Sequence, residues 1–158
     1  MFCSNCGKEI PNSDFFCKYC GKELEPIDLD AYTQKIRELR RPTDFQVAKI
    51  INMIHKRELY SQQYANLEEY GNKELGLKKA TMYMYSRVYD KFFDHKGNPR
   101  IENIEEWSIA NLQELIPLSI QEIIFLQNNG FLNPQLKQSE IRQLVRGIKE
   151  LKEEEKGN

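Results

Sequence analysis

Two near-identical segments at the start of the sequence constrain the fold more than any other feature of its 158 residues. C-x-x-C-G-K-E-I begins at Cys3, and C-x-x-C-G-K-E-L begins at Cys17. Two residues between paired cysteines allow a tight turn to point both sulfurs at one ion. Gly7 and Gly21 tolerate the left-handed backbone that brings amides near the thiolates. All four cysteines of the chain lie in these pairs, which favours metal over disulfides in a reducing cytosol.

The spacing predicts one structural zinc ion held by four thiolates, those of Cys3, Cys6, Cys17 and Cys20. Such a site keeps no open ligand position, so we do not expect the metal to be catalytic. Iron in a rubredoxin-like site and a redox dithiol are the alternatives. About 25 residues cannot bury a useful core, so metal binding is expected to drive the folding of this segment.

Lysines and aromatic residues surround the two cysteine pairs. Four thiolates on one divalent ion leave a local charge of about −2, and three lysines are placed to offset part of it: Lys8, Lys18 and Lys22. Four rings are expected to cover the segment: Phe2, Phe15, Phe16 and Tyr19.

Residues 2–24 resemble the short zinc-ribbon domain found at the N-termini of many bacterial and archaeal proteins. Its ligands match the four cysteines one for one. The resemblance implies a small β-hairpin zinc ribbon, which we place at residues 1–25.

Beyond the ribbon, apolar residues recur at helical spacing, so the fold class is predicted to be mostly α. Residues 26–43 read as a linker and a first helix that begins near Leu29 and stops at Pro42. Residues 44–155 read as a helical domain whose first helix is capped by Thr43 or Asp44. Its later helices are predicted from their end signals: one ends at Pro117, one runs from Ser119 to Gly130, and one starts at Ser139.

Residues 65–93 form a helix-turn-helix-like segment in this interpretation. A helix over residues 65–74 and a turn at residues 75–77 precede a helix from Lys78 to Phe92. Its apolar face is predicted to consist of Thr81, Met84, Tyr85, Val88 and Phe92. Its displayed face is predicted to carry Lys78, Lys79, Met82, Tyr83 and Arg87, of which the lysines, Tyr83 and Arg87 are candidate contacts to a partner or nucleic acid. The alternative is an ordinary helical bundle in which the Met and Tyr residues are core.

Charge and composition narrow the function classes. Net charge is −1, but residues 27–100 carry fourteen Lys/Arg against ten acids, and residues 101–158 carry six against ten. His55 and His95 stand in polar surroundings and are expected to be solvated. We find no Gly-rich phosphate loop and no Ser/His/Asp set, so an enzyme is not expected. No run approaches the roughly 18 apolar residues of a membrane span, and no signal core opens the sequence, so we expect a cytoplasmic protein.

Three segments in order, LGLKKATMYMYSRVYDKF, WSIANLQELIPLS and NPQLKQSEIRQLVRGIKE, are similar to small helical proteins of phages and mobile elements of Gram-positive bacteria. This resemblance implies an origin in a phage or mobile element. The acidic residues 101–158 favour a non-enzymatic inhibitor that binds a host protein, and the resemblance makes an anti-CRISPR inhibitor of a type II RNA-guided DNA nuclease its most specific form. The alternative is a DNA-binding transcriptional or replication regulator, in which the ribbon supports the helix-turn-helix or forms a homodimer.

Overall fold

The computed structural model describes residues 1–39 and 44–157, without the side chain of Asp44. Its elements are almost all helices, which confirms the mostly-α fold class. Its contacts divide the chain into two compact units, Met1–Tyr83 (unit 1) and Met84–Asn158 (unit 2). The predicted domain boundaries at residues 25 and 43 separate parts that are expected to fold on their own. A division by contacts does not test separate folding, so these boundaries stay predictions.

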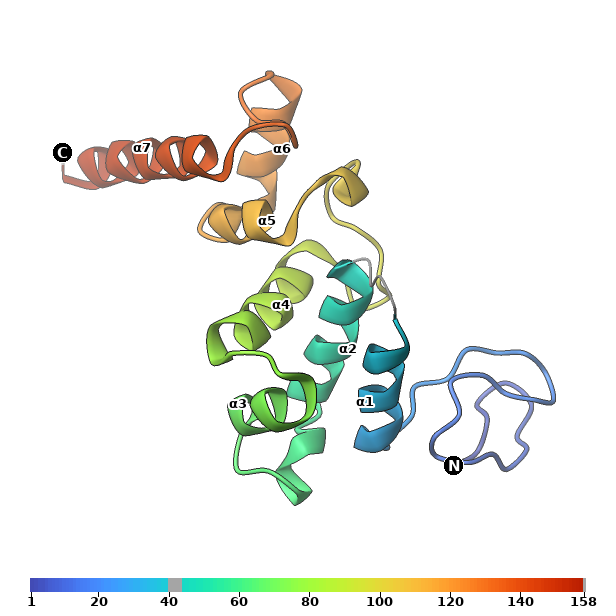
Figure 1. Cartoon of the computed structure of the whole chain (residues 1–158). Helices are drawn as coiled ribbons and strands as arrows, with labels where there is room; N and C mark the ends of the chain where they lie inside the picture. Colours follow the sequence, from blue (N-terminus) through green and yellow to red (C-terminus); the bar gives the residue numbers. More distant parts are fainter. Residues whose placement is uncertain (40–43, 158) are drawn as a thin grey trace. The chain divides into compact units, whose positions relative to one another are not determined.

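Unit 1 begins with the cysteine-rich segment and continues with short helices. These are α1 (Leu29–Glu38), α2 (Asp44–Lys56), η1 (Leu59–Gln62), α3 (Leu67–Tyr70) and the π-helical turn η2 (Gly71–Leu75). α1 and α2 pack against each other and lie side by side in Figure 1. The Asp28 side chain caps α1 by accepting a hydrogen bond of 2.9 Å from the N–H of Asp30. The predicted stop at Pro42 and the cap by Thr43 or Asp44 lie outside the described residues and side chains.

Polar contacts join α1 to the segment that follows α2. Buried Thr33 on α1 lies 2.8 Å from the Tyr70 hydroxyl. Arg37 donates to both the carbonyl and the carboxylate of Glu74 at 2.9 Å, and Tyr64 donates to the same carboxylate at 2.5 Å. Because these bonds connect positions far apart in sequence, they fix η2 against α1 as one body. The apolar core of unit 1 includes Val47, Ala48, Ile51, Ile54, Leu67 and Met82.

The two helices predicted on either side of Gly76 are present. α3 and η2 together cover Leu67–Leu75, and α4 covers Lys79–Phe92, starting in unit 1 and continuing into unit 2. Gly76 has a φ of +65°, a backbone conformation that favours glycine, and it ends η2 there. Asn66 caps α3 by accepting from the N–H of Glu69 at 2.8 Å.

The predicted faces of α4 are partly wrong. Met82 was assigned to the displayed face but is fully buried, whereas Met84 is only half-buried. Val88 and Phe92 are buried as predicted. The cause is Gly71, whose missing side chain leaves the space that the Met82 thioether fills.

Unit 2 continues with four further helices, η3 (Ile104–Glu106), α5 (Ile109–Leu115), α6 (Ile120–Asn128) and α7 (Gln138–Gly157). Ser108 and Ser119 cap α5 and α6 by accepting from the N–H groups of Asn111 and Glu122. After α6, Gly130 has a φ of +74°. The helix ends predicted from Pro117, Ser119 and Gly130 are therefore confirmed, and the last helix begins one residue before Ser139.

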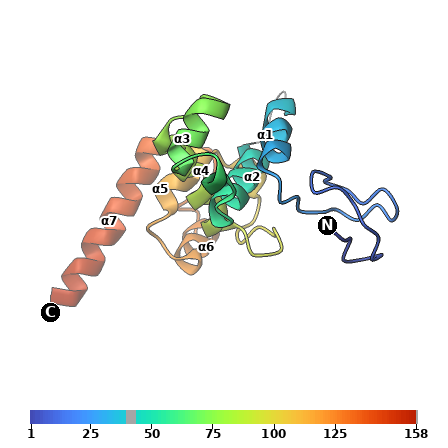
Figure 2. The same cartoon turned by 90° about the horizontal axis from the view of Figure 1, so that it is seen from below.

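α7 packs on α5 and is the longest helix of the chain as described. Figures 1 and 2 show it as a straight helix that ends away from α5 and α6. Within residues 1–39 and 44–157, no single helix is long and apolar enough to cross a membrane. α5 and α6 meet that length and composition only when taken together, across a bend of 111°.

Candidate metal centre

The two cysteine pairs fold as two copies of one turn, offset by fourteen residues. The N–H of Cys3 donates to the carbonyl of Lys8 at 2.9 Å, and the N–H of Cys17 donates to that of Lys22 at 2.8 Å. The N–H groups of Gly7 and Gly21 donate to the carbonyls of Cys3 and Cys17 at 2.8 and 2.7 Å. Both glycines have positive φ, +68° and +72°, so the predicted left-handed backbone is confirmed. The sequence repeat is therefore also a repeat of backbone geometry.

One antiparallel bridge closes each turn. These bridges pair Phe2 with Glu9 and Phe16 with Glu23. The small core between the turns consists of Cys3, Ile10 and Cys17, with Met1 and Leu24 packed against it. With only five such residues, the segment depends on what its cysteines bind.

The four sulfurs lie within 4.8 Å of one another. The Sγ atoms of Cys3 and Cys20 are 3.6 Å apart, and so are those of Cys6 and Cys17. A tetrahedral zinc with Zn–S bonds of about 2.3 Å places its sulfurs about 3.8 Å apart. The observed separations fit that tetrahedron, and both 3.6 Å pairs join one turn to the other. A single ion at the centre would therefore cross-link the two turns.

Hydrogen bonds favour the thiolate form at two of the cysteines. Backbone N–H groups of Cys6 and Asn5 hold the pKa of the Cys3 thiol below its usual range. The side-chain amide of Asn5, followed by the backbone of Lys22, lowers the pKa of Cys20 to about 6. Amide donors, rather than the nearby lysine charges, are thus the main cause of these low pKa values.

Cys6 behaves in the opposite way. The backbone N–H of Lys8 favours its thiolate, but desolvation and the three neighbouring cysteine sulfurs outweigh that bond and raise its pKa to about 11. Four sulfurs this close cannot all carry charge without a cation among them. A divalent metal removes that conflict, because its positive charge lies among the four thiolates that bind it.

Residues 2–24 match the family model of the zinc-ribbon domain. The four cysteines of this zinc ribbon form the site for one structural Zn²⁺, as predicted. All four ligand positions are taken by protein sulfur, so the site is closed and its role is to hold the fold together. No curated protein and no solved structure is detectably similar to the chain.

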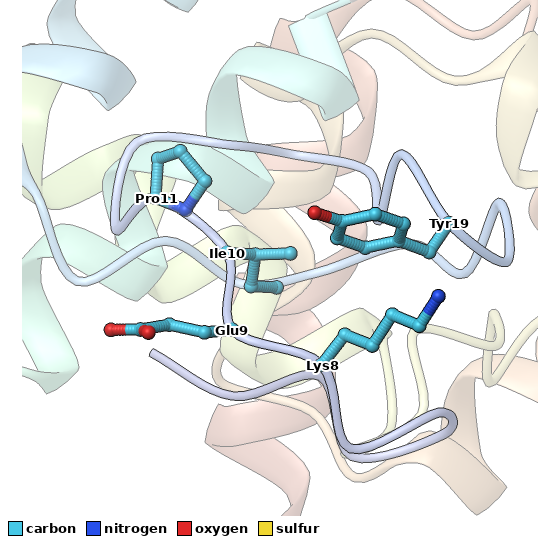
Figure 3. Close-up of a pocket in the computed structure, with 5 residues that line it drawn as sticks. All are labelled: Lys8, Glu9, Ile10, Pro11 and Tyr19. Atoms are coloured by element: carbon cyan, nitrogen blue, oxygen red, sulfur yellow. The ribbon is translucent and has the colours of Figure 1, made fainter.

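The lysines of the zinc ribbon make contacts that the sequence did not indicate. Lys8 and Lys18 lie 4.4 and 5.1 Å from the centre of the Tyr19 ring, and Lys22 donates to Ser4 at 2.9 Å. A shallow, open hollow of about 550 Å³ is lined by Lys8, Ile10 and Tyr19, whose side chains are drawn in Figure 3. Glu9 and Pro11 complete its lining.

The predicted aromatic cover is wrong for three of the four rings. Phe2, Phe16 and Tyr19 are more than half exposed, at 71%, 58% and 51%. Phe15 instead packs edge-on against Tyr32 of α1, with 5.4 Å between ring centroids. Asn5, which was not among the predicted site residues, is the largest cause of the lowered pKa of Cys20. Its equivalent in the second turn is Tyr19, so the repeat gave no signal for it.

Further contacts attach the zinc ribbon to the helices of unit 1. Lys35 lies 5.6 Å from the centre of the Phe15 ring. Glu25 forms an ion pair with Arg57, which also donates to the carbonyl of Pro26 at 3.4 Å. These contacts place the ribbon against α1 and the end of α2.

The candidate contact residues of α4 have different environments. Lys78 and Arg87 are exposed. Lys79 lies 3.1 Å from the Glu68 carboxylate. The Tyr83 ring stands edge-on to His55 at 5.3 Å, so His55 is half-buried and not the solvated residue that was expected. His95 is exposed, as expected.

Proposed function

We propose that the chain is a non-enzymatic protein that inhibits a host protein by binding to it, with the zinc ribbon as a structural element. Its most specific form is an anti-CRISPR inhibitor of a type II RNA-guided DNA nuclease. The observation that carries this proposal is the surface of residues 101–158, where acidic side chains outnumber basic ones by ten to six and large apolar side chains are exposed. The exposed apolar residues there are Ile124, Phe125, Phe131 and Leu151.

This combination suits a protein partner better than a nucleic acid. Exposed aromatic and aliphatic side chains are typical anchors of protein interfaces. Type II nucleases hold nucleic acid in positively charged channels, and an acidic ligand gains association rate and selectivity against such a surface. The choice of a nuclease rests on the resemblance to proteins of phages and mobile elements.

The non-enzymatic part of the proposal rests on the chemistry of the candidate groups. The four thiol ligands close the metal centre, so it offers no position for a substrate. The His55 ring packs against Tyr83, and His95 lies on an exposed loop.

A mixing experiment tests the proposal. The full chain, loaded with zinc, is combined with a purified type II nuclease and its guide RNA, and the products are analysed by size-exclusion chromatography and DNA cleavage. We expect a stable complex and loss of cleavage at chain concentrations of about 1 μM. Absence of both a complex and inhibition across nucleases from several Gram-positive hosts would overturn the nuclease as partner.

A DNA-binding regulator is the second candidate, favoured by the order of α3, η2, Gly76 and α4 and by the exposure of Lys78 and Arg87. Two observations weaken it. Lys79 is paired with Glu68, and the N-terminal part of α4 buries Met82. A groove-binding helix also needs cations for phosphates, and this one has few.

Binding to random duplex DNA separates the two candidates. If the chain is a DNA-binding regulator, we expect tight binding that weakens steeply between about 50 and 200 mM salt. In that case, replacing Lys78, Lys79 and Arg87 together by alanine should abolish the binding. The inhibitor predicts weak binding that this triple variant leaves unchanged.

A further inference from the structure

α7 is held to its unit along one face. Ile141 and Val145 on this face are buried. Arg142 donates two hydrogen bonds to the Glu114 carboxylate of α5, at 2.7 and 3.1 Å, and Lys152 forms an ion pair with Glu122 of α6. These contacts determine which face of α7 turns inward.

Next to this face, α7 carries a shallow groove of about 440 Å³. Its apolar lining consists of Leu144, Gly147, Ile148 and Leu151, and its polar lining consists of Gln143, Glu150 and Glu154. All seven residues come from α7 itself, so no other described segment lines the groove. Leu151 within it is 63% exposed.

The spacing of the apolar residues suits a second helix. Leu144, Ile148 and Leu151 follow the i, i+4, i+7 pattern that places side chains in one stripe. Gly147 lies beside that stripe, and a Cβ added to it would meet open space. A partner helix could therefore approach the backbone of α7 closely at this point, as in helix-in-groove recognition.

The polar lining of the groove is acidic. Glu150 and Glu154 line it, and none of its lining residues is a lysine or arginine. Arg146 donates to Glu150 at 2.8 Å, but both side chains are well exposed, and such a surface pair contributes little to stability. A cation from a partner can therefore replace Arg146 at little cost.

We propose that this groove binds an amphipathic helix of a partner protein whose apolar stripe is flanked by lysine or arginine. The apolar stripe supplies the contact area, and Glu150 and Glu154 select the basic flanks. A second copy of this chain fits less well. In a parallel or an antiparallel pair of α7 helices, the glutamates of one groove would face glutamate or glutamine of the other. The inference rests on the proposed function only in taking the partner to be a protein.

A designed peptide tests the groove directly. The probe is a helical peptide of about 18 residues with leucines at i, i+4 and i+7 and lysines beside them, and its matched control has glutamates in place of the lysines. Binding of each peptide to the full, zinc-loaded chain is measured by fluorescence anisotropy. We expect the lysine peptide to bind at least about tenfold more tightly. Equal binding of the two peptides would overturn the proposal.

Variants of the chain locate the binding. Leu151→Asp should weaken binding of the lysine peptide by about tenfold or more, whereas Phe125→Asp should leave it within about twofold. Both residues are equally exposed, at 63% and 62%, so neither change should unfold the chain. The double change Glu150→Lys and Glu154→Lys should reverse the preference between the peptides. An equal loss in the Phe125 variant, or an unreversed preference, would overturn the groove as the site.

The peptide and nuclease experiments fail independently. Binding of the lysine peptide without any nuclease complex would support the groove and overturn the nuclease as partner. A nuclease complex that Leu151→Asp leaves intact, together with no peptide preference, would support the inhibitor and overturn the groove. Self-association that Leu151→Asp abolishes would also overturn it, because the occupant would then be a second copy.

Discussion

The ring of Phe15 in the zinc ribbon stands edge-on to the ring of Tyr32 in α1, with 5.4 Å between centroids and 87° between planes. Tyr32 is fully buried, and burial is the main cause that raises its pKa to about 12. The contact therefore joins the metal-dependent segment to the apolar core of the helices. Edge-to-face aromatic pairs contribute about 0.5–1.5 kcal/mol beyond the area that they bury.

Replacing Phe15 by alanine should loosen the ribbon from α1 without releasing zinc. We expect unit 1 to lose about 1–2 kcal/mol of stability, less than for a fully buried Phe, because Phe15 is half-buried. Hydrogen exchange at α1 and elemental analysis measure the two effects. Phe16→Ala is the matched control, since that ring is 58% exposed and should change stability by no more than about 0.5 kcal/mol. Equal effects of the two changes would contradict the role of Phe15.

Zinc should be bound at about one ion per chain, and Cys17→Ser should abolish it. Since the ribbon core contains only five residues, losing the metal should unfold residues 1–25 and leave the helices folded. Elemental analysis measures the zinc, and far-ultraviolet circular dichroism measures the helices. Ser13→Ala, on the exposed turn between the cysteine pairs, is the control that should retain the metal. Protein purified without chelator that contains no zinc would contradict the site.

The features predictable from the sequence depend on local chemistry. The four ligands follow from C-x-x-C spacing, because the turn that presents two sulfurs is set by the residues within it. The start of α6 follows from Ser119 and Glu122, whose side chains each bond the backbone of the other to form a capping box. In both cases the groups that interact lie within a few residues of each other.

The features that could not be predicted depend on contacts distant in sequence. Along residues 81–85 of α4 nearly every side chain is large, so helical periodicity does not decide which Met faces inward. Met82 faces inward because Gly71, eleven residues away, has no side chain and leaves room for it. Likewise Asn5 acts on Cys20 across the ribbon, and spacing within one turn carries no information about the other turn.

Gly71→Ala should destabilise unit 1, although alanine usually stabilises a helix by about 1 kcal/mol relative to glycine. Gly71 has helical dihedrals, but a Cβ there would lie 2.5 Å from Cγ and 2.8 Å from the sulfur of Met82. Overpacking of this kind typically costs about 1–3 kcal/mol, which exceeds the helix propensity gain. Denaturant unfolding measures the net change.

Gly147→Ala is the matched control for that prediction. This glycine is also helical, and a Cβ there meets open space. Alanine should therefore stabilise α7 by up to about 1 kcal/mol. If both changes shift stability in the same direction, the space beside Met82 is not what decides the effect at Gly71.

Glu122 should make the stability of unit 2 depend on pH in the acid range. Lys152, followed by the N–H of Ser119, lowers the pKa of its carboxyl from 4.5 to about 2. A group whose pKa is lower in the folded state stabilises the fold above its ordinary pKa. The contribution of Glu122 is therefore complete above about pH 4.5 and is lost as pH falls towards about 2.

Glu122→Gln tests this pH dependence. Glutamine keeps a side-chain oxygen for the capping box but loses the charge that pairs with Lys152. We expect a loss of about 1 kcal/mol or less at neutral pH, because the pair is partly exposed, and a shallower fall of stability between about pH 4.5 and 2. Thermal unfolding across this range measures the slope, with Glu102→Gln, an exposed site, as the control. An identical slope in wild type and Glu122→Gln would show that the ion pair with Lys152 does not hold α7 to α6 in solution.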